Sequence, residues 1–297
     1  MYKIGIDLGG TKVEGIVLDS DSNEVFRKRM PNGKEKGYEF LLNNIKSLYN
    51  QCVEKCLSDK HTVGLGMPGS LDRETGLLNN SSNLPCMSQK PFLSDLERIL
   101  DHKVGLDNDA NCFALAEAVL GAGRGKDLVF GVILGTGVGG GLVFKGEVIK
   151  GMRDCTGEWG HSTIDYKNGD EWHGGVNGAV EAYISGSGVQ ARYKSKNDEE
   201  LATADIVYNY RNGAVKSVEA MDEFFEYFGI AMSNLIKFYD PEVIVLGGGL
   251  SNIEELYTEG IKRVAKYNLN KELYTPIVKN KFGDSAGVFG AALIGLE

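Results

Sequence analysis

Two short apolar runs lie close together early in the chain, at Lys3–Leu8 and Val13–Asp19, and both are rich in Ile and Val around a glycine turn. This pattern predicts two β-strands joined as a hairpin. In other stretches apolar residues recur at helical spacing, which predicts amphipathic helices. One such stretch contains Leu41, Ile45, Leu48, Cys52 and Cys56, and another contains Phe224, Phe225, Phe228, Met232, Leu235 and Ile236.

The strand, turn and strand pattern occurs a second time. The segment GIDLGGTKVEGIVL from Gly5 matches GVILGTGVGGGLVF from Gly131 without a gap. A repeated unit at a fixed offset is typical of a duplicated domain, although chance agreement in a window rich in Gly and Val is the alternative. We favour duplication. Two related α/β halves, each presenting a glycine hairpin to a shared cleft, would hold a nucleotide's phosphates from both sides.

Composition and charge exclude several classes of partner. The 297 residues include 40 glycines and only 6 prolines, and the clustering of the glycines predicts loops where the backbone approaches a ligand closely. A net charge of -9 disfavours nucleic acid as a partner, because phosphate binding needs clustered Lys and Arg. No signal-peptide pattern or membrane-spanning run is found, so we expect a cytoplasmic protein without a membrane partner.

The 5 cysteines are an odd number and are scattered along the chain, which predicts reduced thiols rather than a disulfide framework. Cys52 and Cys56 fall within a helical pattern, where they are better explained as small core residues than as metal ligands.

The first hairpin carries Asp7, Gly9, Gly10, Thr11 and Lys12 at its turn. Glycines at such a turn let amide groups point at phosphate oxygens. Asp7 would hold Mg²⁺ through water, because magnesium keeps much of its hydration. The alternative is a tight hairpin that needs glycine only for its backbone conformation.

The second hairpin, Gly135-Thr136-Gly137-Val138-Gly139-Gly140, satisfies the dinucleotide-binding pattern G-x-G-x-x-G. That fingerprint must open a helix. Here Leu142 to Phe144 predict a strand and a turn follows, so a dinucleotide-dependent dehydrogenase is disfavoured.

Three further segments carry polar or glycine-rich chemistry. Asp107-Asn108-Asp109-Ala110-Asn111 precedes a helical stretch. Its crowded carboxylates and amides are suited to binding a sugar hydroxyl and accepting its proton. The alternative is that these residues cap the helix. Gly157-Glu158-Trp159-Gly160-His161 and the later Glu181 combine acids and a histidine that suit polyol recognition. A buried strand from Pro241 ends in Gly247-Gly248-Gly249, where a planar base can lie against the backbone.

Together these motifs resemble the ROK family (repressors, open reading frames and kinases) over nearly the whole chain. The resemblance rests on IGIDLGGTK, GMPGSLDRETG, LDNDAN, VILGTGVGGGLVF, GEWGH, VEAYISG, DPEVIVLGGGLSN and FGDSAGVFGAA, in the family's order and spacing. It implies two RNase-H-like α/β domains of the actin-like, hexokinase superfold around an interdomain cleft. We expect one domain at residues 1–112 joined by 286–297, and the other at 113–285. ATP, Mg²⁺ and a homodimer are also implied.

The resemblance assigns roles position by position. Asp109 is similar to the family's catalytic base. The residues similar to its sugar-binding set are Gly69, Asn83, Asn108, Asp109, Glu158, His161 and Glu181. Those similar to its nucleotide-binding loops are Asp7, Gly9, Gly10, Thr11, Lys12, Gly135, Thr136, Gly137, Gly247, Gly248 and Gly249.

The chain departs from the family in two places. Family repressors carry a DNA-binding helix-turn-helix ahead of the first hairpin, and here that hairpin starts at residue 3. The family's zinc segment, C-x-C-G-x-x-G-C-x-E, corresponds to residues 172–181, where Trp172, Gly174 and Ala179 replace the three cysteines. Because structural zinc needs about four ligands, mostly thiolate, we expect no zinc here.

These features predict an ATP-dependent kinase that phosphorylates the 6-hydroxyl of a hexose. The wording GMPGS, GEWGH and YISGSG is similar to fructokinases with broad hexose activity, which puts fructose first, with glucose and mannose. N-acetylglucosamine or N-acetylmannosamine kinase is the alternative, because LDNDANCFALAEA is similar to bacterial N-acetylglucosamine kinases. A catalytically silent sugar sensor is a more remote hypothesis, disfavoured by Asp109 beside both phosphate hairpins.

Overall fold

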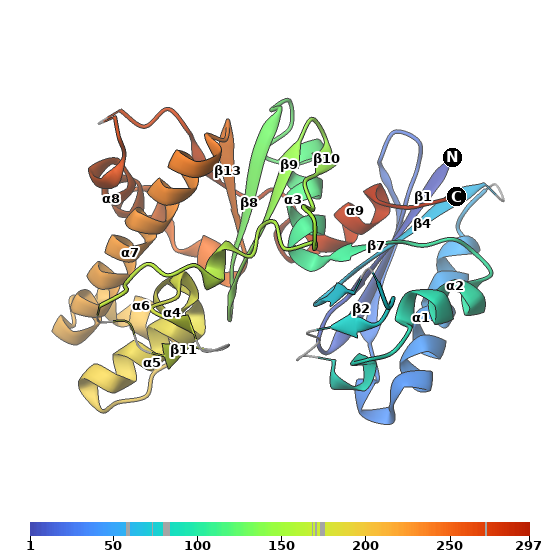
Figure 1. Cartoon of the computed structure of the whole chain (residues 1–297), viewed down its shortest axis with the longest axis horizontal. Helices are drawn as coiled ribbons and strands as arrows, with labels where there is room; N and C mark the ends of the chain where they lie inside the picture. Colours follow the sequence, from blue (N-terminus) through green and yellow to red (C-terminus); the bar gives the residue numbers. More distant parts are fainter. Residues whose placement is uncertain are drawn as a thin grey trace. The chain divides into compact units, whose positions relative to one another are not determined.

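Both predicted hairpins form antiparallel strand pairs. The computed structural model describes residues 1–57, 60–72, 74–79, 84–167, 169, 171–172, 176–270 and 272–297 (Figure 1). Strands β1 (Tyr2–Leu8) and β2 (Lys12–Leu18) form the first hairpin, and β8 (Leu128–Leu134) and β9 (Val138–Phe144) form the second. The dinucleotide fingerprint therefore lies in a strand hairpin, as the sequence predicted.

The chain divides into two compact units. The first contains Met1–Glu117, Lys150–Cys155 and Asp284–Glu297, and the second contains Ala118–Ile149 and Thr156–Gly283. The sequence placed the domain boundaries after residues 112 and 285. In the structure the first unit extends to residue 117, resumes at residue 284 and takes in residues 150–155 as well.

The first unit is built on a five-stranded sheet of order β3-β2-β1-β4-β7. Strands β1, β4 and β7 run parallel, so the residues that follow them meet at one edge. The remaining elements of this unit are β3 (Glu24–Pro31), α1 (Tyr38–Val53), β4 (His61–Met67), β5 (Ser70–Leu71), β6 (Leu78–Asn79), α2 (Phe92–Leu100), β7 (Gly105–Asn108), α3 (Asp109–Val119, which ends beyond the boundary at residue 117) and α9 (Ala286–Leu293).

Three glycines in register across this sheet let helix α9 approach its backbone. Gly5 of β1 pairs with Gly64 of β4, which pairs with Gly105 of β7. A Cβ at these positions would lie 2.3 Å from the carbonyl oxygen of Val288, 2.0 Å from that of Ala291 and 1.9 Å from that of Ile294. Glycine is required at this row because any side chain would overlap the backbone of α9 and the turn after it.

Helix α1 covers the opposite face of the same sheet. Ile16 of β2 pairs with Gly5, so these two residues point to the same face of the sheet. Gly15, the neighbour of Ile16, points to the opposite face, where a Cβ would meet Leu48 and Cys52 of α1. Figure 1 shows α9 on one side of β1 and β4, and α1 and α2 on the other. The sheet is therefore covered on both faces, as its parallel strands require.

The second unit repeats this topology. Its sheet has the order β10-β9-β8-β13-β14, in which β8, β13 and β14 are parallel and β9 is antiparallel to β8. The other elements are β10 (Glu147–Val148), β11 (Glu171–Trp172), β12 (Val176–Asn177), α4 (Val180–Ile184), α5 (Gly186–Asn197), α6 (Thr203–Arg211), α7 (Val215–Tyr239), β13 (Val243–Gly247), α8 (Glu259–Tyr267) and β14 (Ile277–Lys279).

The match between the two hairpins is not gapless in three dimensions. Leu8 pairs with Val13 in the first hairpin, which leaves a turn of residues 9–12, whereas Leu134 pairs with Val138 in the second, which leaves residues 135–137. The second turn is therefore one residue shorter. The same strand order in both units supports duplication, and the turns are where the two copies differ.

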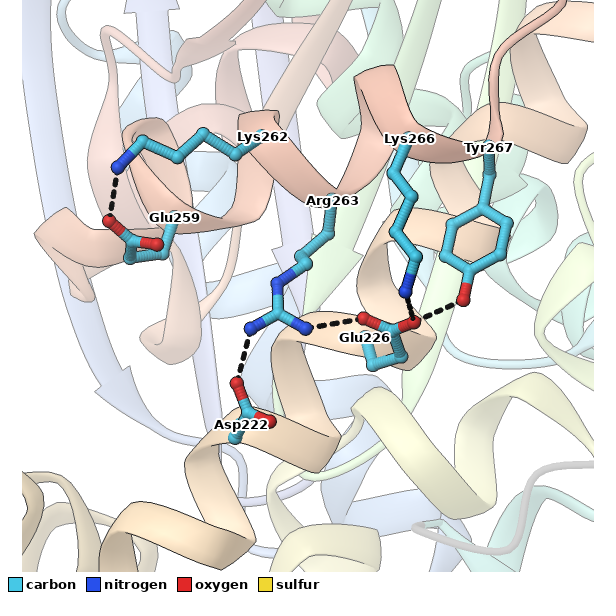
Figure 2. Close-up of polar contacts among 7 residues, drawn as sticks. All are labelled: Asp222, Glu226, Glu259, Lys262, Arg263, Lys266 and Tyr267. Carbon is cyan, nitrogen blue, oxygen red and sulfur yellow. Dashed lines mark hydrogen bonds and ion pairs between the residues drawn. The ribbon is translucent and has the colours of Figure 1, made fainter.

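A charged network joins α7 to α8 on the surface of the second unit (Figure 2). Glu226 of α7 accepts hydrogen bonds from Arg263, Lys266 and Tyr267 of α8, and Arg263 also contacts Asp222. Burial alone would raise the pKa of Glu226, but the bonds from Lys266, Tyr267 and Arg263 outweigh it and lower that pKa to about 2. This network fixes the position of α8 against α7.

All five cysteines are free, and Cys52 and Cys112 are buried. Cys56 lies beyond the end of α1 and is half-buried, so the predicted helix ends before it. Within the described ranges, none of the helices combines the length and the apolar character that crossing a membrane requires.

Candidate active site

The glycine turn between β1 and β2 is held by a residue that follows β3. The amide of Gly9 donates to the carbonyl oxygen of Lys12 at 2.9 Å. Nδ2 of Asn32 donates to the carbonyl oxygen of Gly9 at 2.8 Å, and its amide donates to that of Thr11 at 3.1 Å. Asn32 is 1% exposed, so it holds the turn from the buried side, whereas Thr11 and Lys12 are exposed to solvent.

Acidic side chains cluster beside this turn. Asp7, the second-last residue of β1, lies opposite Glu14 of β2. Burial raises the pKa of Asp7 to about 7, and the negative charges of Asp109 and Glu14 add to that rise. Glu14 is 6% exposed and forms an ion pair with Arg29 at 2.5 Å, so its own charge is compensated. Asp7 and Asp109 are close enough for the charge of Asp109 to raise the pKa of Asp7.

The DNDAN segment joins β7 to α3. Oδ1 of Asn108 accepts the amide of Asn111 at 2.6 Å, so Asn108 caps the helix. Asp107 is buried, and its Oδ1 accepts bonds from the amide of Asn108 and from Nδ2 of Asn111, both at 2.8 Å. Asp109, the first residue of α3, is exposed. The capping alternative therefore applies to Asn108, and Asp109 is the carboxylate presented to solvent.

A pocket of about 510 Å³ lies in the first unit beside this segment. Its described lining residues come from the end of β4, the β5 strand, helix α2, strand β7 and the segment 150–155. They are Met67, Gly69, Ser70, Leu71, Asp72, Gly76, Leu93, Leu106, Asp107, Asn108, Lys150 and Asp154. The volume is within the range of small-molecule sites. The pocket brings together two predicted sugar-binding residues, Gly69 and Asn108, and Asn83 lies outside the described residues.

The turn between β8 and β9 in the second unit is fixed by a helix end and a carboxylate. The amides of Gly186 and Ser187, in the first turn of α5, donate to the carbonyl oxygens of Gly135 and Thr136 at 2.8 and 3.3 Å. Oε2 of Glu181 accepts the amide of Val138 at 2.8 Å. The structure therefore gives Glu181, a predicted sugar ligand, a second task in holding a predicted phosphate turn.

The GEWGH segment packs on β9 through its glycines and its tryptophan. Trp159 is 9% exposed, and its Nε1 donates to the carbonyl oxygen of Gly139 at 3.2 Å. Gly157 has φ +98° and lies against the backbone of Gly140, where a Cβ would be 2.3 Å from the carbonyl oxygen. Glu158 and His161 remain about half exposed, with Oε2 and Nε2 3.5 Å apart. These two side chains are the ones available for a ligand.

The glycine turn after β13 lies next to the β8–β9 turn. Gly247 pairs with Ile133 of the parallel strand β8, so the two strands end at the same edge of the sheet. Gly248 has φ +77°, and a Cβ there would be 2.4 Å from the carbonyl oxygen of Leu134. The second unit thus brings together Gly247, Gly248 and Gly249 with Gly135, Thr136 and Gly137, as expected of two parts of one nucleotide site.

The residues around Asp7 fit a hydrated magnesium ion. Among the described residues, no group of three or more His, Cys, Asp or Glu side chains could hold a metal. Magnesium, however, usually keeps several waters and is bound through one or two carboxylates plus substrate phosphates. Asp7, a carboxylate beside the predicted phosphate turn, would provide that kind of contact, and a bound cation would offset the negative charges of Asp109 and Glu14 that raise its pKa.

The segment that corresponds to the family's zinc loop is held by other contacts. Trp172, at a cysteine position of the pattern, packs against the core of the second unit, and its Nε1 donates to Oε1 of Glu181 at 2.8 Å. Gly174 lies outside the described residues. Strands β11 and β12 pair at Trp172 and Val176. An indole packed against the core therefore stands where the family pattern has a cysteine.

Sequence reasoning missed three residues of these sites. Glu14 lies two residues beyond the first glycine turn without belonging to it, and Asn32 and Lys150 follow strands without a recognisable pattern. The signal for Glu14 was its place opposite Asp7 in the predicted hairpin, because facing residues of a hairpin can be paired once its turn is known. Asn32 and Lys150 are brought to the sites by tertiary structure alone.

Comparisons with known proteins agree along the whole chain. The ROK family model matches residues 3–297. An N-acetyl-D-glucosamine kinase of Yersinia enterocolitica is 37% identical over 302 residues, covering 99% of each chain, and one from Aliivibrio fischeri is 38% identical over 305 residues with the same coverage. A ROK hexokinase of Thermus thermophilus is 31% identical, with a TM-score of 0.92 and coverage of 99% of this chain and 98% of that one.

A ROK glucokinase of Streptomyces griseus, in complex with glucose and AMPPNP, has a TM-score of 0.79 at 23% identity and shares the fold. The two repeated α/β units and these relatives define a sugar kinase, a phosphotransferase with an alcohol group as acceptor. The chain belongs to the ROK family.

Proposed function

We propose that this sugar kinase is an ATP-dependent N-acetyl-D-glucosamine kinase that phosphorylates the 6-hydroxyl of the sugar. The observation that carries the proposal is the similarity to N-acetyl-D-glucosamine kinases over 99% of the chain, at 37% and 38% identity. The sequence had placed fructose first, on the wording of short motifs. Similarity along the whole chain favours the alternative.

The geometry of the first unit supports the acceptor side of this reaction. Asp109 is the exposed carboxylate of its motif and would accept the proton of the sugar hydroxyl. Asn108, fixed by its bond to the amide of Asn111, lines the adjacent pocket together with Gly69. Phosphoryl transfer depends on holding the sugar hydroxyl close to its base. Asp109 as the candidate base, with Asn108 and the pocket beside it, could hold the hydroxyl in that position.

The glycine turns support the donor side. Turns anchored by Asn32 in one unit, and by Glu181 and α5 in the other, present backbone amides suited to phosphate oxygens. Asp7 would hold Mg²⁺ through water, and the ion would neutralise phosphate charge. Gly247, Gly248 and Gly249 would lie against the adenosine. Glu158 and His161 would bind sugar hydroxyls.

A coupled assay of ADP release tests the proposal. N-acetylglucosamine, N-acetylmannosamine, glucose, mannose and fructose are each supplied with Mg-ATP over a range of concentrations. We expect the highest kcat/KM for N-acetylglucosamine, with the phosphate on the 6-hydroxyl by NMR. A higher kcat/KM for fructose would restore the first sequence-based expectation, and no turnover with any of the five sugars would support the sensor hypothesis.

A further inference from the structure

The pocket of the first unit combines an apolar wall with one cation. Leu71 of β5, Leu93 of α2 and Leu106 of β7 line it, and all three are half-buried against the core of that unit. Lys150 is the one basic side chain among the described lining residues. A hexose that carries only hydroxyl groups would leave the three leucines without an apolar partner, which costs hydrophobic free energy.

Leu106 and Asn108 point to the same side of β7. The strand alternates between buried Gly105 and Asp107 and half-buried Leu106 and Asn108. Residues two apart on a strand share a face and are separated by about 7 Å. A hexose bound to Asn108, a predicted sugar ligand, could therefore reach Leu106 with one of its substituents.

Lys150 is held next to Leu106. Its Nζ lies 2.9 Å from Oδ2 of Asp107 and donates to the carbonyl oxygen of Leu106 at 3.5 Å. Asp107 is 5% exposed in its side chain and Lys150 is 39% exposed, so the pair points from the buried strand toward the pocket. An ammonium group has three donors, and the bond to Leu106 uses one of them, while the contact with Asp107 is an ion pair.

We propose that Lys150, Leu71, Leu93 and Leu106 form a subsite for the acetamido group of the sugar. The methyl group packs on the leucines, and the acetamido oxygen accepts a hydrogen bond from Nζ of Lys150. The inference rests on the proposed function, since it names the residues that distinguish N-acetylglucosamine from glucose. Asp107 acts through Lys150, whose ammonium it orients.

Two variants with matched controls test this subsite, and the readout is the ratio of kcat/KM for N-acetylglucosamine to that for glucose. Leu106→Ala is paired with Ile99→Ala, because Ile99 of α2 is also half-buried against this core but is not among the lining residues. Lys150→Met is paired with Lys150→Arg, which keeps a charged donor. We expect Leu106→Ala to lower the ratio about tenfold, the order expected for one methyl group in an apolar pocket.

Lys150→Met should lower the ratio by about the same factor, mainly through KM for N-acetylglucosamine, and Lys150→Arg should restore part of it. Ile99→Ala should leave the ratio unchanged even if it lowers the melting temperature. If Leu106→Ala and Lys150→Met reduce both sugars equally, their role is structural and the subsite is rejected. If the wild-type enzyme does not phosphorylate N-acetylglucosamine, the proposed function itself is rejected. That outcome is distinguishable from rejection of the subsite alone, in which the wild-type enzyme is active on N-acetylglucosamine.

Discussion

Asp107 and Asp109 stand two positions apart and have opposite surroundings. Asp107 is buried and bonded to Asn108, Asn111 and Lys150, whereas Asp109 is exposed at the first turn of α3. A strand that passes directly into a helix produces this difference, because β7 directs Asp107 inward and ends at Asn108. We therefore infer that Asp109, rather than Asp107, exchanges a proton with the sugar.

Asp109→Asn should therefore abolish phosphorylation and leave the fold intact. An amide cannot accept the hydroxyl proton, and loss of a general base typically costs about 10²- to 10⁴-fold in rate. The measurement is kcat in the coupled assay, with circular dichroism as a check on folding. Asp205→Asn, an exposed position in α6, is the matched control. Turnover above about a tenth of wild type would reject Asp109 as the base on that scale.

The glycines show what the sequence could and could not predict at this scale. Their clustering predicted loops at a ligand, and Gly248 and Gly135 do lie at turns of the candidate site. Gly5 and Gly64, which belong to other clusters of glycines, lie within strands beneath α9 instead. A single sequence shows that a side chain is absent but does not show what occupies the space. The hairpins and the exposed acids were predictable because they depend on local patterns.

At the scale of elements, the packing of α9 on the sheet depends on the glycine row. Gly64→Ala places a Cβ 2.0 Å from the carbonyl oxygen of Ala291, a backbone atom that cannot move without shifting the helix. We expect the free energy of unfolding to fall by about 3 kcal/mol, the upper end for overpacking. Denaturant unfolding measures it.

Gly9→Ala is the control for that experiment, with stability as the only readout. Its Cβ would meet the nearest atom at 3.5 Å, an ordinary contact, and it lies in the turn directly after the strand that contains Gly5. If Gly64→Ala proves as stable as Gly9→Ala, the close approach of α9 is incorrect.

The network between α7 and α8 makes stability depend on pH. The pKa of Glu226 is about 2 in the folded protein and 4.5 by its ordinary value, so the folded state binds its proton less tightly. Its contribution is complete above pH 4.5 and is lost as the pH falls toward 2. We expect Glu226→Gln to lower the free energy of unfolding at pH 7 by about 1 to 3 kcal/mol.

The difference between Glu226→Gln and wild type should shrink as the pH is lowered through 4.5, measured by denaturant unfolding at a series of pH values. Glu219→Gln, an exposed position on α7, is the control and should show little change at any pH. A difference that is independent of pH would mean that lost packing, rather than the charge of Glu226, causes the effect.

At the scale of the whole molecule, the sequence predicted two related units because the repeated hairpin is a local pattern. It did not predict that residues 150–155 return to the first unit, where Lys150 pairs with Asp107. No local signal marks that excursion, since it depends on a contact between segments about forty residues apart. The pocket was missed for the same reason, because its wall comes from elements that are distant in sequence.

The changed zinc segment gives a prediction for the molecule as a whole. Because Trp172 packs on the core and bonds to Glu181, the loop does not need a metal to hold Glu181 in place. We expect activity to survive chelation of zinc once Mg²⁺ is restored, and elemental analysis of untagged protein to find no stoichiometric zinc. Zinc that is bound at one equivalent, and whose removal abolishes activity, would overturn this expectation.

The position of α9 in the first unit has a consequence for protein synthesis. The sheet that α9 covers is made of residues 2–108, but α9 itself comes from residues 286–293. When residues up to 283 have left the ribosome, the whole second unit is available to fold. At that moment one face of the first sheet is still uncovered, because α9 has not yet emerged. We expect the second unit to fold first during translation, against the usual order from the N-terminus. Limited proteolysis of stalled nascent chains would show protection of residues 156–283 before protection of residues 1–117.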